Sequence, residues 1–291
     1  MQATQVPGET PGGRLRRLLD GGELIIAPGI FDGLTAHLVR LMGFRAGYLT
    51  GAGIAASGFG LPDIGLVGMA EMADRVAMAT RVLREVPLIA DADTGYGPPM
   101  SVARTVRAYE QAGVAAIQLE DQAFPKRCGH LPGKELVSPE ESLARLGAAL
   151  EARTDALIIA RTDARAVLGL DAAIERGNAY AAAGADVIFV EAPRTVEEMA
   201  LIAREISAPK LINIVAGGLT PQVEPAALHD LGYAIAIYPT TALLAAANAA
   251  SSALSGIGTA SAPAPVATME DFFRLVGLDE WFAVSERWDA K

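Results

Sequence analysis

Cysteine and histidine are scarce in this sequence, whose 291 residues include one Cys and three His. A single Cys cannot form a disulfide within the chain, which fits a reducing compartment. No His-rich zinc pattern is present. No apolar stretch reaches about 18 residues without a charge, Gly or Pro, so no membrane-spanning helix is expected.

Targeting and nucleotide-binding signals are also missing. Residues 1–13 lack the apolar segment of a secretory signal peptide, and no Gly-x-x-x-x-Gly-Lys-Ser/Thr phosphate loop occurs. The net charge of −10 argues against non-specific nucleic-acid binding, although a local basic pocket can still hold an anionic substrate. We therefore expect a cytoplasmic protein with no membrane or nucleic-acid partner.

One glycine-rich segment imitates a dinucleotide-binding fingerprint. Residues 51–56 read Gly-Ala-Gly-Ile-Ala-Ala, but residues 57–62, Ser-Gly-Phe-Gly-Leu-Pro, are rich in helix breakers. The fingerprint needs a helix at this point. We expect instead a loop whose backbone N–H groups face a substrate carboxylate.

Short apolar segments alternate with amphipathic ones along most of the chain. The composition, 51% hydrophobic and 20% charged, allows a large core. Strands are expected at 24–27, 45–50, 87–91, 114–120, 156–161, 186–191, 210–214 and 233–238, and helices at 14–19, 33–42, 69–84, 100–112, 139–151, 171–183, 196–206, 224–231 and 240–254. Eight continuously apolar strands joined by helices predict a closed (β/α)8 TIM-type barrel.

Polar residues gather where these strands end. They are Thr50, Asp91, Asp93, Glu120, Asp121, Arg161, Asp163, Glu191 and Asn213. Barrel enzymes place their chemistry at the C-terminal ends of the strands, so this set predicts an active site there. Helix capping could account for one or two of the acids, but not for the whole set.

The ends of the chain read differently from the barrel. We expect a flexible N-terminus at 1–13, a barrel domain at 14–254, a linker at 255–267 and a helical tail at 268–291. The tail carries Phe272, Phe273, Trp281, Phe282 and Trp288. These aromatics need a surface, either the parent barrel or a neighbouring subunit.

The sole cysteine lies in the segment Lys126-Arg127-Cys128-Gly129-His130. Two cations and an imidazole around a thiol are expected to lower its pKa, which favours a functional thiol. The alternative is a small buried hydrophobe among ordinary surface charges.

The segment Asp91-Ala92-Asp93 places two acids at a strand end, followed by Gly95 and Gly97. Hard carboxylate oxygens suit Mg²⁺, with Mn²⁺ as an alternative. Asp63 and Glu120 could join through bound water.

Taken together, these motifs resemble the isocitrate lyase and phosphoenolpyruvate mutase superfamily. The resemblance rests on residues 48–53, 61–63, 91–97, 120–122, 126–130, 161–163, 191–193 and 213. Lys-Arg-Cys-Gly-His resembles the signature of its carbon–carbon lyases. The segments that begin at Glu191 and Asn213 look less like isocitrate or methylisocitrate lyases and more like the group of 2,3-dimethylmalate lyase, oxaloacetate hydrolase and carboxyphosphonoenolpyruvate mutase.

The resemblance implies a role for each site residue. Asp91 would bind Mg²⁺, with Asp63, Asp93 and Glu120 holding its waters. Thr50, Gly51 and Ala52 would contact the carboxylate of the 2-oxo-acid portion, with Arg161 close by. Cys128 would be the acid/base, flanked by Gly129 and His130, and Glu191 and Asn213 would complete the pocket. Tyr48 or a metal-bound water would accept the substrate hydroxyl proton.

The expected activity is Mg²⁺-dependent cleavage of a 2-hydroxy di- or tricarboxylate to a 2-oxo acid such as pyruvate plus a carboxylate. Phosphonomutase or oxaloacetate hydrolase chemistry in the same pocket is the nearest alternative, and a non-catalytic scaffold or metabolite sensor is the alternative of another class. The resemblance also implies a homotetramer, a dimer of dimers that swap their C-terminal helices.

Overall fold

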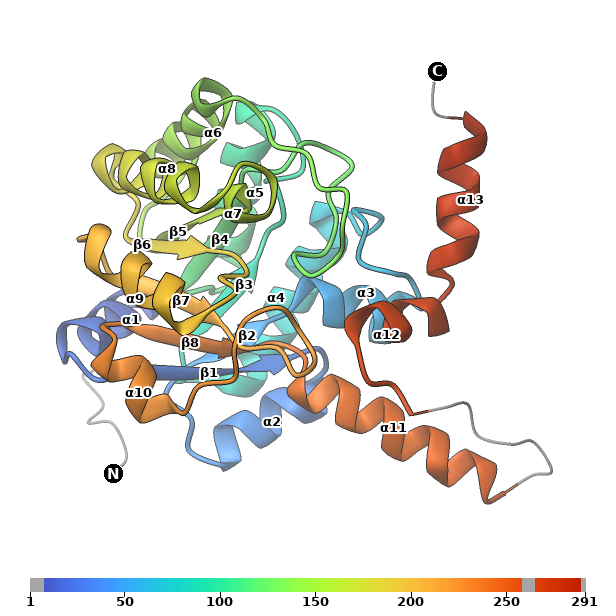
Figure 1. Ribbon diagram of the computed structural model, residues 1–291. Helices are drawn as coiled ribbons and strands as arrows, with labels where there is room; N and C mark the ends of the chain where they lie inside the picture. The colour runs from blue at the N-terminus through green and yellow to red at the C-terminus, as the bar shows by residue number, and fades with distance from the viewer. Residues whose placement is uncertain (1–7, 258–264, 289–291) are drawn as a thin grey trace.

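Eight parallel strands form a closed barrel in which each strand pairs with the next in chain order (Figure 1). The computed structural model describes residues 8–257 and 265–288. Strand β1 closes the ring by pairing with β8, with Ile25 beside Ile235. The predicted (β/α)8 fold is thus confirmed.

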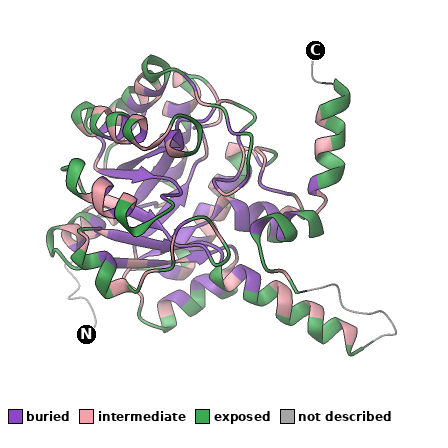
Figure 2. Cartoon of the chain, viewed as in Figure 1, coloured by how far each residue is buried: buried purple, intermediate pink, exposed green. Residues whose placement is uncertain are grey.

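The strands are short and buried on both faces, as Figure 2 shows. They are β1 (Ile25–Ile30), β2 (Gly47–Leu49), β3 (Leu88–Asp91), β4 (Ala116–Glu120), β5 (Leu157–Thr162), β6 (Val187–Val190), β7 (Lys210–Asn213) and β8 (Ile235–Tyr238). Strand β1 continues through Pro28 and Gly29, where the sequence predicted its end. A Cβ atom at residue 29 would lie 2.1 Å from the Pro239 carbonyl oxygen, so only glycine fits beside β8.

Amphipathic helices cover the outside of the barrel. They are α1 (Pro11–Asp20), α2 (Gly33–Leu41), α3 (Gly51–Phe59), α4 (Met69–Leu83), α5 (Pro99–Gln111), α6 (Pro139–Ala152), α7 (Ala164–Val167), α8 (Leu170–Ala183), α9 (Val196–Glu205) and α10 (Pro225–Asp230). The sequence did not predict α3 or α7. No helix within the described ranges is long and apolar enough to cross a membrane.

Three further helices follow the barrel: α11 (Thr241–Ser255), α12 (Met269–Leu275) and α13 (Leu278–Trp288). Helix α12 packs on its own barrel, because Met269, Phe272 and Phe273 are buried in the barrel's apolar core. Helix α13 projects beyond it and is largely exposed (Figures 1 and 2). The exchange of these helices between subunits stays a prediction.

The predicted division into terminus, barrel, linker and tail also stays a prediction. Residues 1–7 and 258–264, which bear on the flexible start and on the linker, lie outside the described residues. Helix α1 begins at Pro11, three residues before the predicted start, because Thr10 caps it by accepting a hydrogen bond from the Gly13 N–H.

Candidate active site

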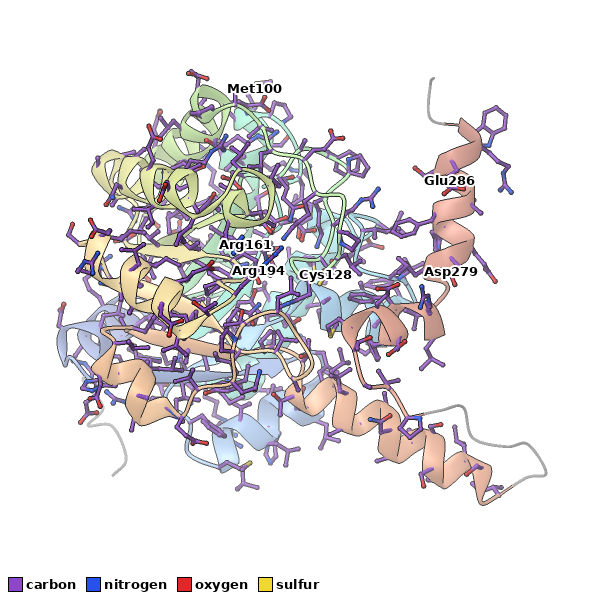
Figure 3. All side chains as sticks on the ribbon, in the orientation of Figure 1. Met100, Cys128, Arg161, Arg194, Asp279 and Glu286 are labelled. Carbon is purple, nitrogen blue, oxygen red and sulfur yellow. The ribbon has the colours of Figure 1, made fainter. Side chains whose placement is uncertain are left out.

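The C-terminal ends of the strands surround a small hollow. In Figure 1 the strand arrowheads point to the side on which α12 lies. The hollow is lined by Tyr48, Thr50, Ala52, Asp63, Asp91, Cys128, Gly129, His130, Arg161, Glu191 and Asn213. The other predicted site residues, Gly51, Asp93 and Glu120, border it through contacts described below. Figure 3 labels Arg161 on β5 and Cys128 on the loop after β4.

Helix α3 presents its N-terminus to this hollow. The Thr50 hydroxyl caps the helix by accepting from the Gly53 N–H at 3.1 Å, and Gly60 ends it in the left-handed conformation. The expectation of a loop here was therefore wrong, because these two caps outweigh the helix-breaking residues between them. The Gly51 N–H donates to Asp91 Oδ2 at 3.3 Å, so the helix N-terminus faces a carboxylate.

Asp91, the last residue of β3, is held from several directions. Its Oδ1 accepts from the Asp93 N–H at 3.1 Å and from Gln118 Nε2 at 3.3 Å. Gln118 in turn accepts from the Tyr48 hydroxyl at 3.2 Å. Burial and the Asp91 charge raise the pKa of Tyr48 well above its usual value. Tyr48 is therefore a neutral phenol that supports Asp91 through Gln118.

Lys126 lies between two of the predicted metal-site acids. Its ammonium contacts the Asp63 carboxylate and lies 2.7 Å from Asp93 Oδ1. Burial, together with the charges of Asp91 and Asp63, raises the pKa of Asp93 to about 7 despite this cation. The cluster is thus richer in acids than its one lysine can balance.

Arg161 connects the remaining acids of the mouth. Its Nη1 lies 3.0 Å from Glu120 Oε2, and its Nε donates to Asp163 Oδ2 at 2.9 Å. Glu191 Oε2 is 3.7 Å from the same nitrogen. All three carboxylates are buried. The guanidinium, which lines the hollow, is consequently fixed in one orientation by these carboxylates.

His130 lines the hollow and, like Arg161, lies beside Glu191. Its Nδ1 accepts from the Leu219 N–H at 3.2 Å, so in the neutral ring the proton sits on Nε2, which lies 3.5 Å from Glu191 Oε1. Burial lowers the pKa of His130, which favours this neutral form. Asn213 Nδ2 also donates to Glu191 Oε2 at 3.3 Å. His130 therefore presents an N–H donor at the site.

Cys128 is buried, with a free thiol that borders the hollow. Burial and the nearby Asp63 charge raise the pKa of this thiol to about 12. The predicted lowering of its pKa was wrong. Lys126, two residues earlier in sequence, is paired with Asp63 and Asp93, and the guanidinium of the adjacent Arg127 lies over the Phe282 ring. Cys128 is therefore a protonated thiol, suited to giving a proton.

The carboxylates fit a hard divalent cation. Glu120 Oε1 is buried without a hydrogen-bond partner among the described residues, and Asp93 has a raised pKa. No three His, Cys, Asp or Glu side chains in the described ranges are arranged to hold a metal ion together. Mg²⁺ keeps several waters and needs only one or two direct carboxylates, so Asp91 with water-bridged neighbours satisfies it.

The structure adds residues that the sequence did not single out for the site. They are Gln118, Lys126 as a partner of the acids, Lys134, Val215, Thr240 and Met269. Asp163, which the strand-end pattern did identify, accepts from both Arg161 and Lys134. Met269 had no sequence signal, because it reaches the hollow from α12, far along the chain.

Comparison with known proteins agrees with this geometry. A model of the phosphoenolpyruvate phosphomutase family matches residues 15–257, and the chain belongs to this family. The chain is 46% identical to 2,3-dimethylmalate lyase of Eubacterium barkeri, covering 92% of this chain and 94% of the relative. It is 43% identical to 2-methylisocitrate lyase of Aeropyrum pernix, covering 94% and 90%. The resemblance stated from the motifs is thus confirmed.

Solved structures share the fold over nearly the whole chain. A crystal structure of 2,3-dimethylmalate lyase is 38% identical, with a TM-score of 0.85 over 98% of this chain and 97% of that one. A phosphonopyruvate hydrolase in complex with oxalate and Mg²⁺ is 30% identical, with a TM-score of 0.75 over 96% and 99%.

Proposed function

We propose that this protein is a magnesium-dependent carbon–carbon lyase. Its substrate is a 2-hydroxy di- or tricarboxylate resembling 2,3-dimethylmalate or 2-methylisocitrate, cleaved to a 2-oxo acid such as pyruvate plus a carboxylate. The observation that carries the proposal is Cys128, a buried protonated thiol that shares one hollow with Asp91 and Arg161. The relatives named lyases support it.

Cys128 is the proton donor in this scheme. The substrate hydroxyl gives its proton to water in the hollow, the C2–C3 bond breaks, its electron pair passes to the departing carboxylate fragment, and the hydroxyl carbon becomes the carbonyl of the 2-oxo acid. The thiol then gives its proton to the carbanion carbon of the departing fragment and becomes a thiolate. A positioned acid contributes about 10²–10⁴ in rate.

The substrate carboxylate of the 2-oxo-acid portion binds at the N-terminus of α3. Thr50, Gly51 and Ala52 surround that N-terminus, where the helix dipole favours an anion. The Thr50 N–H already donates to the Ile30 carbonyl and the Gly51 N–H to Asp91 Oδ2, so Ala52 contributes the backbone N–H for the substrate. Arg161, fixed by its three acids, faces the same space. The neutral His130 would donate its Nε2 proton to the departing fragment in place of Glu191, whose Oε1 lies 3.5 Å away. Asn213 Nδ2 donates to the same Glu191 carboxylate, and Gly129 allows close backbone approach.

The residues that would hold Mg²⁺, with Mn²⁺ as an alternative, are Asp91, Asp93, Asp63 and Glu120. When bound, it withdraws electron density from the substrate hydroxyl and carboxylate oxygens. Tyr48 does not serve as the base, because its phenol is neutral and donates to Gln118. Its part is to orient Asp91 through Gln118.

The proposal also covers the location and the oligomeric state of the enzyme. We propose that it is cytoplasmic and forms a homotetramer whose subunits exchange their C-terminal helices. The aromatic residues that α13 leaves exposed support the latter, with Trp288 82% exposed.

A substrate panel tests the reaction. Purified protein is incubated with 2,3-dimethylmalate, 2-methylisocitrate, isocitrate, oxaloacetate or phosphonopyruvate, with Mg²⁺ or with EDTA, and 2-oxo acid and phosphate are measured. We expect metal-dependent 2-oxo acid from a branched hydroxy acid. Phosphate release alone would favour the phosphonate chemistry, and silence on every substrate would favour a non-catalytic role.

Cys128→Ser is the matched variant for this assay. Serine keeps the shape of the side chain but is a far weaker acid, so kcat is expected to fall about 10²- to 10⁴-fold. Circular dichroism and the unfolding midpoint should stay those of the parent. Turnover close to that of the parent would contradict the role of Cys128.

A further inference from the structure

Lys134 is a buried lysine to which the proposed chemistry assigns no role. It lies four residues after His130, and 3% of its side chain is exposed. Its ammonium donates to the Gly129 carbonyl oxygen at 2.5 Å and to Asp163 Oδ1 at 2.8 Å. The residue therefore joins the backbone of the Cys128 loop to the end of β5.

Asp163 is the carboxylate that also holds Arg161. Arg161 Nε and Nη2 donate to its two oxygens at 2.9 and 3.1 Å. The Asp163 carboxylate thus fixes the orientation of the Arg161 guanidinium. Through Lys134 it also fixes the position of the Cys128 loop. Removing Lys134 leaves Asp163 paired with Arg161 but leaves the Gly129 carbonyl without this donor.

The position of Gly129 has little tolerance. A Cβ atom on this residue would lie 2.7 Å from Glu191 Cγ and 2.8 Å from Arg161 Nη2. The loop backbone therefore rests directly on site side chains, with Cys128 and His130 on either side. The Cys128 N–H also donates to the Asp63 carbonyl at 3.1 Å. A shift of the loop by a fraction of an ångström moves both functional side chains.

We propose that Lys134 is a positioning residue. It holds the loop that carries Cys128 and His130 against the barrel mouth by donating hydrogen bonds to both the Gly129 carbonyl oxygen and the Asp163 carboxylate. Its effect on turnover rests on the proposed lyase function. Its effect on the loop does not, and it is measured without substrate.

Alkylation of Cys128 by iodoacetamide reports the loop position. The chain has one cysteine, so each alkylated molecule is one in which this loop has opened and exposed Cys128. A buried hydrogen bond from a charged donor is strong enough that its loss in Lys134→Met should speed alkylation about 10- to 100-fold. Any fall in kcat appears only when the open form becomes comparable in population to the closed form.

Lys210→Met is the matched control. Lys210 Nζ also donates to two backbone groups, the Ala203 and Ile206 carbonyls, both at 3.1 Å, but it begins β7 at the far end of the barrel. Its variant should lose some stability yet be alkylated at the rate of the unmodified protein. If both variants react equally fast, global unfolding is the cause and the proposal fails.

Unchanged alkylation in Lys134→Met overturns the proposal, even if activity falls. If that variant does not fold, Lys134→Gln replaces it, because glutamine keeps a neutral donor, and alkylation at an intermediate rate is expected. A Lys134→Gln rate equal to that of the unmodified protein would also overturn it. Failure of the substrate panel leaves the alkylation result unaffected, so the two proposals are tested separately.

Discussion

Cys128 combines a motif that suggests an activated thiolate with surroundings that keep the thiol protonated. The thiol is covered, and Asp63 faces it with negative charge. For a proton donor this is the useful state, because a thiolate has no proton to give. The same residue would be poorly placed as a nucleophile at neutral pH.

The protonation state of Cys128 leads to a prediction. Because its pKa is raised from 9.0 to about 12 in the folded chain, its contribution to stability is complete below pH 9 and is lost as the pH rises toward 12. The ultraviolet absorption band of a thiolate should therefore be missing from the native protein at pH 9. The difference spectrum against Cys128→Ser measures it, with the urea-unfolded chain as the reference. A native thiolate signal rising near neutral pH would contradict this.

The residues of the site could be predicted, but not how they pair. Strand-end position identified Asp91, Glu120, Arg161, Glu191 and Asn213, because parallel strands deliver their ends to one mouth. The ion pairs and hydrogen bonds that these side chains form across the mouth of the barrel leave no pattern in the sequence. Lys126 lies two residues before Cys128, yet its ammonium contacts Asp63, 63 residues away in sequence.

At the scale of elements, α3 is the helix that the local sequence predicted wrongly as a loop. Glycines at 58 and 60 are poor helix residues, but Gly60 serves as the left-handed terminator of the helix. The Ser57 hydroxyl also bonds back to the Gly53 carbonyl at 2.7 Å. The strands were predicted more reliably, because burial on both faces gives continuous apolar runs.

The cap of α3 supports a second prediction. Thr50→Val keeps the side-chain shape but loses the hydrogen bond from the Gly53 N–H, which should lower the free energy of unfolding by about 1 kcal/mol. Because the same N-terminus is proposed to bind substrate, KM should rise as well. Urea unfolding and initial-rate kinetics measure the two effects.

Thr195→Val is the control for this cap. Thr195 caps α9 in the same way, accepting from the Glu198 N–H at 3.2 Å, and does not line the hollow. A similar loss of stability with unchanged KM is expected. If Thr50→Val also left KM unchanged, α3 would not be a substrate-binding element.

For the whole molecule, the acids gathered at one end of the barrel couple metal binding to stability. A ligand that binds only the folded state at 100 times its Kd stabilises that state by about 2.7 kcal/mol. We therefore expect MgCl₂ to raise the unfolding midpoint relative to EDTA. Asp91→Asn should abolish the rise, whereas Asp171→Asn, at an exposed helix start, should keep it. An equal response in both variants would place the metal elsewhere.

Because the Cys128 thiol is covered and protonated, its state also determines how readily oxidants react with it. Peroxides attack thiolates, and only where they can reach them. The Cys128 thiol of the resting enzyme is therefore expected to react slowly with peroxide. In the proposed mechanism the sulfur becomes an anion only after it has delivered its proton, so we expect sulfenic acid formation to follow turnover. Inactivation by peroxide should accordingly scale with catalytic cycles completed and not with time of exposure.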